Sequence, residues 1–121
     1  MLMRKVNINE KFGLIKELWT PKIIGELNGQ DVKLAKVKGE FVWHNHTDED
    51  ELFLIMKGSL KIDFEGESVT LNEGEMLVVP RGVEHRPIAE EEAWILLFEP
   101  QNTKHTGDVK SELTVDKFEK I

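Results

Sequence analysis

Residues 39–58 read G-E-F-V-W-H-N-H-T-D-E-D-E-L-F-L-I-M-K-G. His44 and His46 are two residues apart, so on a β-strand both imidazole rings point to the same face. Glu51 follows His46 by five residues, an odd spacing that would put it on the opposite face of one continuous strand. The run 47–50 is polar and typical of a turn, which predicts that a new strand starts at Glu51. Two adjacent strands can then direct both imidazoles and the carboxylate into one space, where they form a common ligand set for first-row transition metals.

A second stretch adds a third imidazole. Residues 74–89 read G-E-M-L-V-V-P-R-G-V-E-H-R-P-I-A, which predicts an apolar strand, a Pro-Arg-Gly turn and then His85. Together the two stretches resemble the paired sequence motifs of the cupin family, written G-x5-H-x-H-x(3,4)-E-x6-G and G-x5-P-x-G-x2-H-x3-N. The matching positions are, in the first motif, His44, His46, Glu51 and Gly58 and, in the second, Gly74, Pro80, Gly82 and His85.

Two positions depart from the family pattern. Four residues rather than five separate Gly39 from His44, and Ala89 stands where the second motif ends in Asn, at the expected barrel rim. Neither departure removes a ligand. The resemblance implies an all-β fold, a single antiparallel β-barrel or jelly roll of the double-stranded β-helix type. It also implies one divalent ion held by the three histidines and the glutamate, His44, His46, Glu51 and His85. This ligand set suits Fe, Mn, Ni, Co or Zn, and the sequence does not choose among them.

Composition limits the classes of protein to which the chain can belong. Its 121 residues are enough for one domain with a buried core, and 40% hydrophobic and 32% charged residues are typical of a soluble globular protein. Without cysteine it has neither disulfides nor thiolate ligands. No apolar run approaches the roughly 18 residues of a membrane span and no signal peptide opens the chain, so the cytoplasm is the expected compartment. A net charge of −7 argues against nucleic acid or an anionic membrane as partner.

We expect a single cupin domain over residues 1–121, with an N-terminal arm or short helix over 1–20 and a polar tail over 109–121. Asn28-Gly29 predicts a β-hairpin between 22–27 and 31–37, because both residues accept positive φ. The later chain alternates short apolar segments with turn residues, and the acidic run 90–92 is one of the expected turns. The strands predicted there lie near 40–46, 51–57, 59–65, 68–71, 76–79, 84–88 and 93–99.

Several predicted strands are apolar on both faces. Phe53 and Ile55 share the face of Glu51, yet Leu52 and Leu54 on the other face are apolar too. Such strands need cover on both faces, either from the N-terminal arm or from a second subunit. We favour a homodimer that buries the outer face around Trp43, Leu52 and Leu54.

Three functions are open. An ion with one carboxylate ligand keeps a charge near +1, which favours an anionic or chelating oxygen ligand; it would act as a Lewis acid or, as iron, would support chemistry with O2. The first function is a metal-dependent enzyme, either an oxygenase or a sugar or sugar-phosphate isomerase or epimerase, for which the resemblance supplies precedents. The second is a non-catalytic module that binds a small ligand. The third, a structural or storage role, is least favoured for a short single barrel.

The inward side chains favour the oxygenase. Beyond the four ligands, alternation assigns only apolar inward positions: Val42, Phe53, Ile55, Val78 or a neighbour, and Pro87. Acid–base isomerase chemistry needs a second polar group, so we favour an oxygenase-like enzyme acting on a small polar or anionic molecule. Phe53, Ile55 and Arg81 are candidate substrate contacts, Arg81 because a cation at the barrel mouth can hold a carboxylate or phosphate. His105 lies in the expected loop 100–108 without a strand partner and is expected at the surface.

Overall fold

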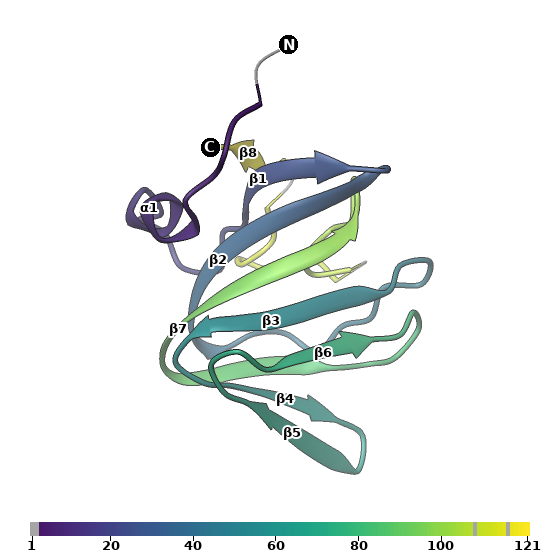
Figure 1. The fold of residues 1–121 in the computed structure, drawn as a ribbon. Coiled ribbons are helices and arrows are strands. Elements are labelled where there is room, and N and C mark those ends of the chain that lie inside the picture. The colour runs from purple at the N-terminus through teal and green to yellow at the C-terminus, as the bar shows by residue number, and fades with distance from the viewer. Residues whose placement is uncertain (1–2, 108, 116) are drawn as a thin grey trace.

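The computed structural model describes residues 3–107, 109–115 and 117–121; the others, 1, 2, 108 and 116, belong to the expected arm, loop and tail and lie outside it. The described residues form one mixed, mostly antiparallel sheet that curls into a barrel, with a short helix outside it (Figure 1). The elements in chain order are α1 (Ile8–Gly13), β1 (Lys22–Leu27), β2 (Gln30–Glu40), β3 (Glu51–Lys57), β4 (Leu60–Phe64), β5 (Glu67–Leu71), β6 (Met76–Val79), β7 (Arg86–Pro100) and β8 (Glu119–Lys120). No helix among these residues is long and apolar enough to cross a membrane.

The hairpin of β1 and β2 is confirmed. Asn28 and Gly29 have φ angles of 48° and 74°, the pair of positive values that a two-residue turn needs to match the twist of its strands. From this turn β2 runs on to Glu40 and pairs with β7 along most of its length. These two long strands, β2 and β7, lie side by side in the barrel in Figure 1.

β7 is one strand where the sequence predicted two. The expected turn at 90–92 is wrong, because Arg86–Pro100 is continuous and the three glutamates lie exposed within it. At this point β7 exchanges one neighbour for another: it pairs with β4 before the glutamates and with β3 after them, while β2 follows both halves. The register with β2 shifts between Val37 and Gly39, opposite the glutamates. Such an irregularity lets a strand bend without ending.

The barrel core lies on the inner face of these strands. In β3 the predicted alternation is confirmed, since Glu51, Phe53 and Ile55 are buried while Leu52 and Leu54 are half-buried. The same face of β7 from Ala93 to Leu97 and of β4 is apolar and buried. Glu51 therefore sits at one end of an apolar interior, where only a strongly favourable partner would keep a carboxylate.

α1 covers part of the outer face, so the N-terminal region forms a short helix rather than an extended arm. The Asn7 side chain caps the helix by accepting a hydrogen bond from the Glu10 backbone N–H at 3.0 Å. Phe12 is buried against Leu34 of β2 and stacks on Trp94 of β7, with ring centres 4.8 Å apart. Part of the two-faced sheet is thus covered from within the chain.

Candidate metal centre

The segment that carries His44 and His46 is not a regular strand. The prediction of a continuous strand over 40–46 is wrong, because this segment pairs with its neighbour only at separated residues. The Phe41 N–H donates to the Pro87 carbonyl at 2.9 Å, and His44 and His85 exchange two backbone hydrogen bonds of 3.0 and 2.8 Å. Between these two backbone pairs the segment advances three residues, from Phe41 to His44, whereas its partner advances two, from Pro87 to His85. Such an unequal count is typical of a β-bulge. The bulge brings His44 opposite His85 and so joins the two motifs at their histidines.

The four predicted ligand residues come together in the structure. His44, His46, Glu51 and His85 are each at most 5% exposed, and one potential ligand atom of each lies within 4.8 Å of the others. The Nε2 atoms of His46 and His85 lie 3.3 and 3.4 Å from Oε1 of Glu51. Within the described part of the chain none of these three atoms has a hydrogen-bond partner. Buried polar atoms without partners are rare, so the group fits a metal site.

Backbone carbonyls orient two of the imidazole rings. Nδ1 of His44 lies 2.9 Å from the Val42 carbonyl oxygen, and Nδ1 of His85 lies 2.9 Å from that of Val83. A carbonyl oxygen can only accept, so Nδ1 carries the proton in both rings and Nε2 carries the lone pair. Metal-binding histidines usually donate their second N–H in this way. The fold therefore presents both Nε2 lone pairs to the cluster.

Burial and neighbouring charges shift the pKa values of the cluster residues. Burial lowers the pKa of His44 to about 4, and the neighbouring His85 acts in the same direction. For His46 burial also acts downward, but the Glu51 carboxylate outweighs it and raises the pKa. Burial alone would raise the pKa of Glu51, yet the contacts with His46 and His85 hold it well below its usual range. An ionised Glu51 beside a neutral His44 is the protonation state that a metal ion requires.

Two charged residues are buried beside the cluster, so the expectation of purely apolar inward positions is wrong. Lys33 and Glu99 are both 0% exposed, and Lys33 Nζ donates to Glu99 Oε1 at 2.9 Å and to the Thr103 carbonyl at 3.4 Å. Burial raises the pKa of Glu99 well above its usual range, and the charge of the nearby Glu51 adds to the effect. The site thus holds a second carboxyl group next to the one predicted.

Strand alternation contained the signal for both residues. Glu99 continues the inward series of β7 after Ile95 and Leu97, and Lys33 precedes Ala35 on the inward face of β2. Both residues lie within the predicted strands 31–37 and 93–99, so the same alternation applied to those strands would have placed both charges inside. No such pattern existed for His105, which is buried although it was expected at the surface. It lies in an irregular segment, and only tertiary packing brings it beside Phe41.

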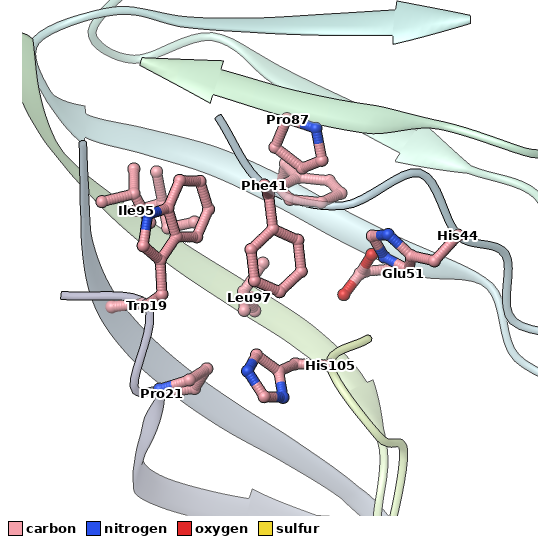
Figure 2. A pocket seen from close by; sticks show the side chains of 12 residues that line it. Trp19, Pro21, Phe41, His44, Glu51, Pro87, Ile95, Leu97 and His105 are labelled. Atoms are coloured by element: carbon pink, nitrogen blue, oxygen red, sulfur yellow. The ribbon is translucent and has the colours of Figure 1, made fainter. Parts of the chain in front are cut away.

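A cavity of about 30 Å³ adjoins the cluster. Figure 2 shows His44 and Glu51 at one side of it and Trp19 at the other, with Phe41 between them. Trp19 and Phe41 stack with ring centres 4.6 Å apart, and Phe53 adds a third aromatic wall. The cavity is therefore apolar except where the cluster residues and His105 reach it.

The remaining predicted positions divide between this cavity and other places. Phe53 lines the cavity, whereas Ile55 packs in the core without lining it. Arg81 is exposed on its turn, where Nε lies 3.5 Å from Oδ1 of Asp50. Ala89, at the motif's Asn position, is buried in the core opposite Gly39 rather than on the rim. The structure thus brings one of the three proposed substrate contacts to the cavity.

Comparison with known proteins matches this arrangement. Residues 31–98, more than half of the chain, match the family model described as the cupin domain. The chain belongs to the cupin family. It is similar to a cupin-2 domain containing protein from Shewanella frigidimarina, with 50% identity and a TM-score of 0.79 over 79% of this chain and 94% of that one. Protein NMB1881 from Neisseria meningitidis is 36% identical, with a TM-score of 0.75 over 81% of this cupin and 100% of that chain.

A relative in sequence adds to this match. YdbB of Bacillus subtilis is 41% identical over 73 residues, a match that spans 60% of this cupin and 65% of YdbB. The predicted family and the all-β barrel are therefore confirmed. In this cupin the two motifs meet where the His44–His85 backbone pair joins them, and the ligand residues converge there.

Proposed function

We propose that this cupin is a metal-dependent enzyme that acts on a small oxygen-bearing molecule. One divalent transition-metal ion would be held by His44, His46, Glu51 and His85. The observation that carries the proposal is the set of buried, unpartnered ligand atoms, Nε2 of His46 and His85 and Oε1 of Glu51, in a group that also borders a cavity. An ion satisfies all of these atoms at once, which no single neighbouring side chain does.

The cavity indicates what such a molecule looks like. A bound divalent ion supplies a Lewis acid for a carbonyl or enolate oxygen or, as iron, redox chemistry with dioxygen. One carboxylate ligand leaves the ion partly uncompensated, so an anionic or chelating oxygen is favoured. The aromatic walls of Trp19, Phe41 and Phe53 favour an apolar body behind that oxygen. Apolar walls exclude water from the reacting centre, which supports the oxygenase-like reading.

Buried polar groups support a second candidate, a sugar or sugar-phosphate isomerase or epimerase. Proton transfer at carbon needs a group that gains and loses a proton beside the substrate. Glu99 could gain and lose a proton next to Glu51, since burial and the charge of Glu51 raise its pKa, although Glu99 does not itself line the cavity. Its Oε2 atom is buried without a hydrogen-bond partner in the part of the chain described.

Metal analysis and oxygen dependence test the proposal. The protein is purified without added metal, its metal content is measured, and a crystallographic difference map is inspected for density at the cluster and in the cavity. Small hydroxy and keto acids and sugar phosphates are then screened with and without oxygen. Oxygen-dependent turnover supports the oxygenase, and anaerobic isomerisation supports the second candidate. Stoichiometric binding without turnover would make the protein a binding module, and a metal-free cluster that takes up no ion would refute the proposal.

The affinity for metal should fall as the pH is lowered. Protons compete with the ion for each Nε2 lone pair. The pKa of His46 is raised above its ordinary value of 6.5, so His46 takes up a proton first, whereas His44, with a pKa of about 4, competes only in stronger acid. We expect a loss of about tenfold per pH unit below about pH 6.5, from one competing proton. Competition with a chromophoric chelator at several pH values measures it, and an affinity that stays flat from about pH 8 to 5 argues against histidine ligands.

We also propose that the protein is a homodimer. The outer face of β3 and β6 is apolar, and the described residues leave it uncovered: Leu52 pairs with Val78 and Leu54 with Met76, and Met76 and Val78 are 53% and 44% exposed. Trp43, also part of the predicted interface, is partly exposed. The helix α1 covers a different part of the sheet. Apolar faces of this kind mark interaction sites in soluble proteins.

Sedimentation at micromolar concentration should show a dimer of the 14.0 kDa chain. Val78→Asp should shift it to the monomer, because a charge would be buried in the interface. Leu14→Asp is the matched control: this residue is also exposed but lies beside α1, away from β6. A wild-type monomer contradicts the prediction.

A further inference from the structure

His105 has a buried nitrogen that nothing in the described chain satisfies. Its Nε2 lies 2.7 Å from the carbonyl oxygen of Leu113, which can only accept, so Nε2 carries the proton. In the neutral ring Nδ1 is then an acceptor. Nδ1 is buried without a hydrogen-bond partner, and the residue as a whole is 5% exposed. Burial lowers the pKa of His105, which keeps the ring neutral.

Packing on two sides holds this ring in place. Its centre lies 5.4 Å from that of Phe41 and 5.6 Å from that of Phe118, and the bond to Leu113 fixes its rotation. Phe41 comes from a distant part of the chain, whereas Leu113 and Phe118 follow His105 in the C-terminal segment. A ring held in this way presents its acceptor in one direction, as a recognition group must.

The His105 ring also lines the cavity beside the metal cluster. In Figure 2 His105 lies below Phe41, and His44 and Glu51 lie to the right. Phe41 separates the two histidines, with ring centres 5.5 Å from His44 and 5.4 Å from His105. One small molecule can therefore extend from the cluster to His105 along the face of Phe41. The cavity is small, about 30 Å³, so it favours a compact ligand.

We propose that His105 is the second anchor for the molecule that binds at the metal. Its Nδ1 accepts a hydrogen bond from a hydroxyl or N–H group on the ligand, while an oxygen at the other end of the ligand reaches the ion. The substrate class is thus a compact molecule with a metal-binding oxygen at one end, a hydrogen-bond donor at the other and an apolar middle. This inference rests on the proposed metal-dependent function.

Two substitutions separate the roles of the ring nitrogens. His105→Gln keeps an N–H group near the position of Nε2, and hence the bond to Leu113, but removes the acceptor at Nδ1. His105→Asn places an amide near Nδ1 and loses the bond to Leu113. If His105 serves only to hold the C-terminal segment, the Asn variant is the damaged one and the Gln variant resembles the wild type.

The binding test uses the zinc-loaded protein and matched probes. Propionate and butyrate are compared with their ω-hydroxy forms by calorimetry. The hydroxy forms should bind about threefold to tenfold more tightly, the value of one hydrogen bond. In His105→Gln this preference should vanish while the affinity for zinc is unchanged. Equal binding of both forms to the wild type, or a preference that survives in His105→Gln, overturns the proposal.

A second test uses the metal-free protein and therefore does not depend on the ion. Nitrogen-15 NMR should find His105 protonated at Nε2 and unprotonated at Nδ1, and titration with propanol should shift the Nδ1 resonance. A protonated Nδ1, or one that propanol does not move, refutes the role of His105 whatever zinc does. Failure to bind zinc together with an Nδ1 that responds to propanol refutes the metal-dependent function instead and leaves the hydrogen-bonding role in place.

Discussion

Glu51→Ala is expected to empty the metal site. Glu51 is the only anion among the four predicted ligands, and it is buried between Nε2 of His46 and Nε2 of His85. Without it the charge of the ion would be buried uncompensated, at a cost of several kcal/mol, which corresponds to a loss of at least about 10²-fold in affinity. His46→Ala or His85→Ala removes a neutral donor and leaves the carboxylate, so neither should reduce the affinity more than Glu51→Ala does.

The fold should survive this loss. The barrel core consists of apolar side chains such as Phe53, Ile55 and Leu97, and its burial does not depend on an ion. Thermal melts with and without a chelator, together with metal analysis of each variant, measure both effects. Asp48→Ala is the matched control, because it removes an exposed carboxylate from the adjoining turn and should keep the metal. Retained metal in Glu51→Ala would show that Glu51 is not a ligand, and unfolding on chelation would show that the ion is structural.

Lys33→Met should destabilise the protein by about 3–5 kcal/mol at neutral pH, the usual result of removing one partner from a buried ion pair. Lys33 Nζ contacts the Glu99 carboxylate and the Thr103 carbonyl, and it lies 3.9 Å from the centre of the Phe118 ring. The pKa of Glu99 is already raised in the folded state. Ionising Glu99 in the folded protein therefore costs stability at pH values above the pKa that Glu99 has in the unfolded chain. This cost grows as the pH rises toward the pKa of Glu99 in the folded protein. Losing Lys33 enlarges the shift, so the penalty should be greater at about pH 8 than at pH 5.

Urea unfolding of the metal-free protein at both pH values measures this penalty. The double variant Lys33→Met/Glu99→Leu should recover most of the stability, because an apolar pair of similar size avoids the buried charge. Lys38→Met is the matched control on the same strand, since its side chain is exposed. A penalty below about 1 kcal/mol, within the range of a surface ion pair, would show that the buried pair does not stabilise the fold.

The sequence alone determined the family, the all-β fold and the four residues that come together in the candidate metal centre. It did so because those features depend on local spacing. The two-residue spacing of His44 and His46, the polar turn before Glu51 and the Pro-Arg-Gly turn before His85 restrict the backbone wherever they occur. The Asn28-Gly29 hairpin and the alternation in β3 were predictable for the same reason, and the structure has both.

Only the tertiary structure decided what surrounds the cluster. The acidic run 90–92 has the composition of a turn, yet it lies within β7, because pairing with β2 on one side and with β4 and then β3 on the other outweighs local preference. Lys33 and Glu99 are 66 residues apart and meet only because β2 and β7 are neighbours. His105 has no periodic pattern, since an irregular segment carries it, and contacts with Phe41 and Leu113 place it at the cavity. Local spacing restricts the backbone over a few residues, whereas the positions of Glu99 and His105 beside the cluster depend on which strands and loops pack together.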